Sequence, residues 1–192
     1  MNTSPDFDRI DRINRIGGSV CQASENPVNP VNPVLEPKLN IVMVEPEIPP
    51  NTGNVARLCA ATRTALHLVE PFGFKLDDTQ LKRAGMDYWM QVQWRRWPNW
   101  LAFEQQLPPG ARLWFIESEG PRHYAEVSYQ TNDYLVFGRE TAGLPKALIE
   151  ANRESWLRIP MFNSKARSLN LSNCVALVLY EALRQQEFSG EI

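Results

Sequence analysis

Residues 39–62 read LNIVMVEPEIPPNTGNVARLCAAT, and this stretch decides the fold class. It starts with Leu39 to Val44, a short run rich in branched apolar side chains that is typical of a buried strand. The prolines that follow predict an irregular loop. Asn51 or Thr52 is then expected to cap a helix that runs through Cys59. A strand, a loop and a helix in this order predict one unit of an α/β fold.

The same alternation continues along the rest of the chain. Short apolar runs predict further strands, and apolar residues at helical spacing predict helices between them. We therefore expect one α/β domain over residues 39–188, with a mostly parallel sheet flanked by helices, and a tail at residues 189–192. The expected strands are 66–69, 91–95, 113–116, 134–137 and 156–159, and the expected helices are 77–85, 97–107 and 169–185.

Residues 1–38 differ in composition from the domain. They contain three consecutive Asn-Pro-Val steps, at residues 26–34. Proline at every third position blocks both helices and sheet ladders and favours an extended chain. We interpret this segment as a disordered Pro/Asn-rich extension, with an RNA-contacting arm or a lid as the alternative.

Composition excludes several classes of protein. The 192 residues carry a net charge of −2, so an overall basic field does not indicate a nucleic-acid partner. The three cysteines have no CxxC spacing, which argues against a zinc site or a disulfide framework and favours a reducing cytoplasm. We expect no metal, since two histidines are too few for a typical zinc site. No apolar run is long enough to cross a membrane.

The first of three notable loops, Pro49 to Arg57, leads into the helix that is expected to run through Cys59. Asn51, Asn54 and Arg57 place side-chain donors near its N-terminus, and Gly53 lets a backbone approach closely. A helix N-terminus with free amides binds anions such as phosphate. The alternative is an ordinary capped helix with a surface arginine.

The other two loops follow predicted strands in the second half of the chain. Phe137 to Pro145 holds two glycines and a proline, which predict a tight loop able to lie against a flat ring, or else a simple turn. Ile159 to Asn173 passes through a polar stretch to a helix that Ser168 or Asn170 can cap. Open parallel sheets bind ligands in such loops.

Basic residues gather locally although the chain is slightly acidic. Pairs of adjacent basic residues near tryptophans favour a surface that binds a nucleic-acid backbone, although such pairs also occur on ordinary solvent-exposed faces. The residues concerned are Lys82, Arg83, Arg95, Arg96, Lys165 and Arg167, with Trp94 and Trp97 between them.

Together the three loops carry a specific resemblance. Asn-Thr-Gly-Asn-x-x-Arg at residues 51–57, Phe-Gly-x-Glu-x-x-Gly-Leu-Pro at 137–145, and Ile-Pro-Met followed by Arg-Ser-Leu-Asn-Leu-Ser-Asn at 159–173 resemble the motifs of the SPOUT superfamily of RNA methyltransferases. Residues 39–50 and 83–88 further resemble its branch that methylates the 2′-hydroxyl of the tRNA wobble nucleotide, C or U at position 34, in leucine tRNAs.

The resemblance implies an α/β-knot fold with a C-terminal trefoil knot, a homodimer, tRNA as substrate and S-adenosylmethionine as methyl donor. It also assigns roles to residues by their place in the motifs. The expected catalytic residues are Arg57, Asn51 and Asn170; the expected cofactor-binding residues are Ile116, Gly138, Ile159, Ser168 and Leu169; and Lys82, Arg83, Lys165 and Arg167 are expected to bind the substrate.

Three alternatives remain open at this stage. A SPOUT enzyme could methylate another tRNA position or rRNA, and a SPOUT module could bind RNA without catalysis. An α/β protein that binds phosphate or a dinucleotide is disfavoured, because the chain lacks the G-x-G-x-x-G fingerprint.

Overall fold

The structure is a computed structural model and describes residues 38–75, 91–163 and 165–192. Residues 1–37 of the extension expected at 1–38, the helix expected at 77–85, and Lys82 and Arg83 lie outside these ranges. Those predictions therefore stay predictions.

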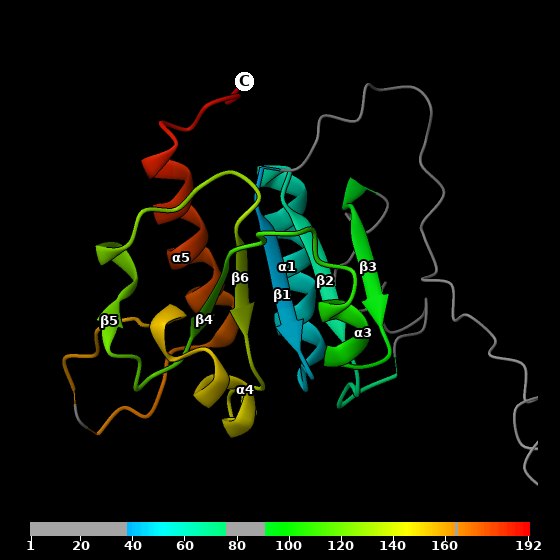
Figure 1. Cartoon of the computed structure of the whole chain (residues 1–192), viewed down its shortest axis with the longest axis vertical. Helices are drawn as coiled ribbons and strands as arrows, with labels where there is room; N and C mark the ends of the chain where they lie inside the picture. Colours follow the sequence, from blue (N-terminus) through cyan, green and yellow to red (C-terminus); the bar gives the residue numbers. More distant parts are fainter. Residues whose placement is uncertain (1–37, 76–90, 164) are drawn as a thin grey trace, which may run out of the picture.

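A seven-stranded sheet forms the centre of the molecule (Figure 1). Every strand pair in it is parallel, so the predicted α/β class is confirmed. The strand order is β3-β2-β1-β6-β4-β7-β5. The strands are β1 (Asn40–Val44), β2 (Ala65–Val69), β3 (Trp94–Trp97), β4 (Leu113–Ile116), β5 (Arg122–His123), β6 (Tyr134–Phe137) and β7 (Trp156–Arg158).

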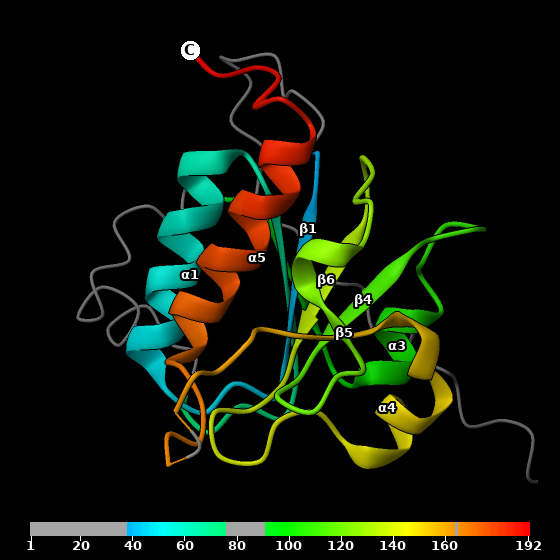
Figure 2. The same ribbon diagram turned by 90° about the vertical axis from the view of Figure 1, so that its left-hand side faces the viewer.

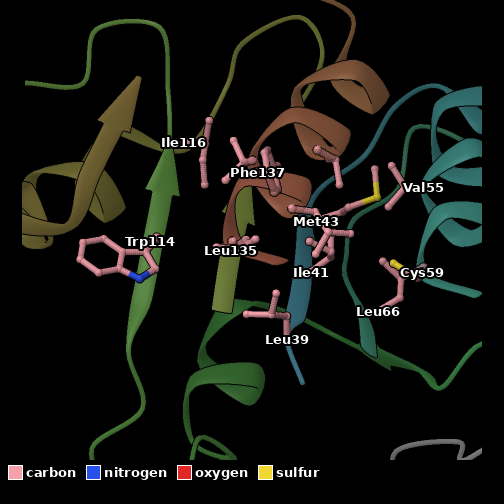
Figure 3. Packing of buried hydrophobic residues seen from close by; sticks show 14 of the residues in the cluster. Leu39, Ile41, Met43, Val55, Cys59, Leu66, Trp114, Ile116, Leu135 and Phe137 are labelled. Carbon is pink, nitrogen blue, oxygen red and sulfur yellow. The ribbon is translucent and has the colours of Figure 1, made fainter. Parts of the chain in front are cut away.

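Helices cover both faces of the sheet (Figure 2). On one face α1 (Pro49–Thr62) and α5 (Leu171–Gln185) lie side by side, and on the other lie α3 (Trp100–Glu104) and α4 (Lys146–Ala151). Successive strand residues point to opposite faces, so the central strands β1, β2, β4 and β6 are mostly apolar, whereas the edge strands β3 and β5 carry exposed polar residues. In Figure 3 the β1 side chains Ile41 and Met43 point toward Val55 of α1.

Most element predictions are confirmed, with some boundaries corrected. Asn51 and Thr52 do not cap α1; the helix begins at Pro49 after Ile48, because proline is tolerated in the first turn, where its missing N–H costs nothing. The third strand lies at Trp94–Trp97 rather than at 91–95, and the helix expected at 97–107 is only Trp100–Glu104.

Three other features refine the prediction in the second half of the chain. Asn170 does cap α5, since its side-chain oxygen accepts the N–H of Ser172. The two-residue strand β5 and the short helix α4 were not predicted, because neither carries a clear apolar period of its own.

The chain is threaded through itself. Residues 117–133 form a loop from the end of β4, through β5, back to the start of β6, which pairs with β4. The strand β7 lies inside this loop, between β4 and β5. It enters from the face that carries α4 and leaves toward the face that carries α5. This passage forms the predicted knot.

Among the described residues, no helix is long and apolar enough to cross a membrane.

Candidate functional site

A pocket of about 530 Å³ lies where the carboxyl ends of β4, β6 and β7 meet the start of α5. A volume of this size suits a nucleoside-sized ligand, and the carboxyl edge of a parallel sheet is where such ligands bind. The lining includes Ile48, Asn51, Ile116, Glu117, Phe137, Gly138, Arg139, Glu140, Gly143, Ile159, Met161, Arg167, Ser168, Leu169, Asn170 and Cys174.

A chain of side-chain hydrogen bonds joins the three loops around this pocket. Asn170 Nδ2 donates to Asn51 Oδ1 at 2.9 Å, and Asn51 Nδ2 donates to Glu140 Oε1 at 3.0 Å. The Glu140 carboxylate also accepts the backbone N–H groups of Glu47 at 2.8 Å and Ile48 at 3.3 Å. Because charge-assisted bonds are the stronger ones, Glu140 fixes the first loop against the second.

A second set of contacts supports the same junction from outside. Glu47 Oε2 accepts the hydroxyl of Thr141 at 2.7 Å and its backbone N–H at 3.1 Å. These bonds lower the pKa of the Glu47 carboxyl. Arg139 Nη1 lies 3.4 Å from Glu45 Oε2. The loop after β1 and the loop after β6 are therefore held together in both directions, because a carboxylate of each loop accepts hydrogen bonds from the other loop.

The glycines of the second loop are required by close approach. Arg139 and Gly143 exchange two backbone hydrogen bonds, at 3.1 and 3.0 Å, which closes a tight turn. A Cβ on Gly138 would overlap the backbone of Gly143 and Leu144, and Gly143 has a φ of +66°. Only glycine fits either position without moving the backbone.

The structure brings most of the predicted site residues together. All five expected cofactor residues line the pocket, and so do Asn51, Asn170 and Arg167. Ile116 ends β4, Gly138 follows β6, and Ser168 and Leu169 precede α5. Their convergence from three distant segments is the arrangement that the motifs indicated.

Two of the expected residues lie elsewhere in the described chain. Arg57 is on an exposed face of α1 and does not line the pocket. Lys165 is exposed in the loop before α5 and also lies outside the lining. Within one chain, therefore, the pocket holds the expected cofactor residues but not the expected catalytic arginine.

Sequence reasoning missed one charged residue of the pocket and one exposed aromatic residue beside it. Glu117 follows β4 directly, and a polar residue at the end of a buried strand was the available signal. Phe162 is 98% exposed in the loop that carries Lys165, where its apolar character has no local explanation. Neither position stood out by spacing or composition.

The pocket suits S-adenosylmethionine by its chemistry. Apolar side chains such as Ile116, Phe137 and Leu169 offer walls for an adenine ring, and the turn at Gly138 brings backbone polar groups to its edge. Among the described residues, no cluster of His, Cys, Asp and Glu has the arrangement of a metal site.

Comparison with known proteins gives the family. Residues 38–180 match the SpoU rRNA Methylase family. The chain belongs to this family. Its α/β-knot fold is that of the SpoU methylases.

Three proteins that are similar to this chain illustrate the family. A protein of Saccharophagus degradans named tRNA (cytidine(34)-2'-O)-methyltransferase is 51% identical over 154 residues, covering 79% of this chain and 97% of the relative. A structure described as giving insights into 2-OH methylation of C/U34 on tRNA is 43% identical with a TM-score of 0.73, covering 78% and 91% of the two chains.

The third is the SpoU methyltransferase AviRb of Streptomyces viridochromogenes, solved in complex with the cofactor AdoMet. It is 25% identical with a TM-score of 0.67, and the match covers 82% of this chain and 64% of AviRb. These similarities confirm the predicted SPOUT methyltransferase class of this SpoU family chain and its cofactor, S-adenosylmethionine.

Proposed function

We propose that the chain methylates the ribose 2′-hydroxyl of nucleotide 34 in tRNA, and that leucine tRNAs are its substrates. The name of the Saccharophagus relative, aligned over 97% of its length, supports the position of the target. The observation that carries the proposal is the hydrogen-bond chain from Asn170 through Asn51 to Glu140, which closes three motif loops around one pocket.

In this proposal the pocket holds the methyl donor through groups already in place. Ile116, Ile159 and Leu169 enclose the adenine, while Gly138 and Ser168 contribute polar backbone and hydroxyl groups. S-adenosylmethionine supplies a methyl group on a sulfonium, whose leaving group is a neutral thioether. The departing side of the reaction therefore needs little help from the protein.

The nucleophile limits this methyl transfer, because a sugar hydroxyl hardly ionises at neutral pH and is therefore weakly reactive. Holding it in line with the methyl carbon supplies several kcal/mol, since orientation alone can contribute up to about 10 kcal/mol. Asn51 and Asn170 orient the pocket side of this arrangement through their mutual bond. Arg57 binds the phosphate beside the target ribose and stabilises the negative charge that develops on the attacking oxygen.

A homodimer explains why Arg57 lies apart from the pocket of its own chain. Helix α5 exposes a stripe that includes Leu177 and Tyr180, which are 42% and 49% exposed, and α5 packs beside α1. Exposed apolar side chains on adjacent helical turns favour a protein partner. In the proposed dimer a second copy covers this stripe and brings its Arg57 to the substrate.

The proposal keeps the domain limits expected from sequence. Residues 39–188 form the methyltransferase domain, residues 1–38 an extension and 189–192 a tail. If the extension only tethers or contacts RNA, removal of residues 1–38 leaves the dissociation constant for S-adenosylmethionine unchanged. A large loss of cofactor affinity after this truncation would contradict that assignment.

The test is methyl transfer from labelled S-adenosylmethionine to tRNA that lacks methylation at nucleotide 34, followed by nuclease mapping. We expect label at the 2′-oxygen of nucleotide 34 in leucine tRNAs, with loss of label in Arg57→Ala. Lys146→Ala is the matched control, because Lys146 is an exposed basic residue of α4 outside the pocket. Label at another nucleotide, or an absence of label from leucine tRNAs, would refute the proposed substrate.

A further inference from the structure

Glu117 holds a carboxylate in the wall of the pocket. It follows the last residue of β4, and its own backbone N–H donates to Leu157 O of β7 at 2.9 Å. Its Oε1 accepts the backbone N–H of Leu144. The carboxylate also fills the space that a Cβ on Gly143 would need. The contacts with β7, Gly143 and Leu144 together restrict the position of the Glu117 carboxylate.

The other carboxylate of the pocket wall, Glu140, and the arginine Arg139 have partners, whereas Arg167 of the same wall is exposed. Glu140 accepts three donors from the first loop, and Arg139 pairs with Glu45. Glu117 differs, because the ion pairs among the described residues do not include it. Burial and the nearby Glu119 raise the pKa of the Glu117 carboxyl, and backbone donors only partly offset this. A cation beside it would stabilise the ionised form.

We propose that the Glu117 carboxylate is the electrostatic partner of the sulfonium of S-adenosylmethionine. The inference rests on the proposed function, and it deepens that function by giving the site a preference between methyl donor and product. The donor carries a positive sulfonium, whereas the product S-adenosylhomocysteine carries a neutral thioether. Glu117 therefore favours the donor and leaves the affinity for the product almost unaffected.

The strength of the preference for donor over product depends on the surroundings of the Glu117 carboxylate. A half-buried carboxylate acts through an effective dielectric constant well below that of water. The fixed backbone around Glu117 means that little reorganisation accompanies binding. The consequence is weaker product inhibition, because the site loses its electrostatic attraction when the methyl group leaves.

Isothermal titration calorimetry with the full chain measures how the Glu117 charge, as distinct from the shape of its side chain, affects the two dissociation constants. In Glu117→Gln the amide oxygen still accepts the Leu144 N–H, while the negative charge is removed. We expect the dissociation constant for S-adenosylmethionine to rise about tenfold, and that for S-adenosylhomocysteine to change less than about twofold. The matched control is Glu150→Gln, which removes the same charge from an exposed residue of α4 outside the pocket and should change neither constant.

Glu117→Asp provides a second variant that keeps the charge. The ratio of the two constants in Glu117→Asp should stay near the wild-type ratio even if both affinities fall. Equal losses for donor and product in Glu117→Gln, or no loss, would overturn the inference while leaving the methyltransferase proposal in place. Failure of the wild-type chain to bind either compound would instead overturn the proposed function, and this inference with it.

Discussion

The Asn170 side-chain amide donates to the side-chain oxygen of Asn51 across 2.9 Å, although 119 positions separate the two residues. The oxygen of Asn170 accepts the Ser172 N–H and so starts α5. The amide of Asn51 in turn donates to Glu140. Helix capping, closure of the pocket and attachment of the second loop thus depend on the same two amides.

Asn51→Asp should therefore destabilise the fold through charge. Asn51 is buried, and the substitution places a carboxylate oxygen where an amide nitrogen now lies 3.0 Å from Glu140 Oε1. We expect a loss of about 1–3 kcal/mol at pH 7 in the free energy of unfolding, measured with urea. Repulsion raises the folded-state pKa of the carboxyl pair, so the loss must shrink as pH falls and a proton enters the pair.

Asn54→Asp is the control, since Asn54 is exposed on the same helix. It should cost much less at pH 7 than Asn51→Asp. An equal cost for both variants would show that the Asn51–Glu140 bond is not the reason.

His67 should make stability depend on pH. The Trp97 indole N–H donates to His67 Nδ1 at 3.2 Å, so the ring proton lies on Nε2 and faces Asn40 Oδ1 at 3.2 Å. Burial, followed by the charge of Arg95, lowers the His67 pKa from 6.5 to about 4. Because the unfolded chain binds the extra proton more readily, stability is complete above pH 6.5 and is lost as pH falls toward 4, by about 3 kcal/mol in all.

Urea unfolding at several pH values tests this sign. His67→Gln removes the titrating ring and should flatten the stability profile between pH 4 and 6.5, relative to wild type. His123→Gln removes a more exposed histidine and should leave the slope nearly unchanged. An unaltered slope in His67→Gln would refute the assignment.

Lys165 and Arg167 should contribute to RNA binding through phosphates. Both are exposed in the loop before α5, next to the pocket. Each substitution to alanine should weaken tRNA binding and reduce the slope of log affinity against log salt by about 1. Filter binding at several salt concentrations measures this slope. Lys146→Ala on α4 is the control, and an equal effect there would mean that binding depends on overall charge.

The exposed stripe of α5 should control the oligomeric state. Leu177→Glu and Tyr180→Glu place charges on the surface that a second copy would bury, and we expect monomers in size-exclusion chromatography with light scattering. Leu101→Glu is a matched control, because Leu101 is 59% exposed on α3, on the other side of the sheet. If all three variants remain dimers, the interface lies elsewhere; if the wild type is a monomer, the proposed dimer is wrong.

The central strands could be predicted because their signal is local. Residues 113–116 and 134–137 are short apolar runs that need both faces covered, and the structure has strands at both. The two residues of β5 carry no such run and become a strand only because β7 pairs with them. The start of α1 could not be predicted from its prolines, because proline fits a loop as well as the first helical turn that Pro49 and Pro50 occupy.

The candidate site also has a part that could be predicted from the sequence and a part that could not. Its pocket residues could be located because motifs place them after strands. The partners of Glu140 could not, since its contacts with Glu47, Ile48 and Asn51 join residues about 90 positions apart and depend on the folded sheet. The place of Glu117 directly after a buried strand is visible in the sequence, but the contact of its carboxylate with Gly143 depends on three-dimensional packing.

The threading of β7 also has a consequence during protein synthesis. The pocket takes its last wall from residues 159–174, which leave the ribosome only after the loop they pass through. A nascent chain, or any fragment that stops before Ile159, lacks that wall however well its first strands have formed. Translation that aborts early therefore releases products with no complete donor site, and such products cannot compete with the finished enzyme for the methyl donor.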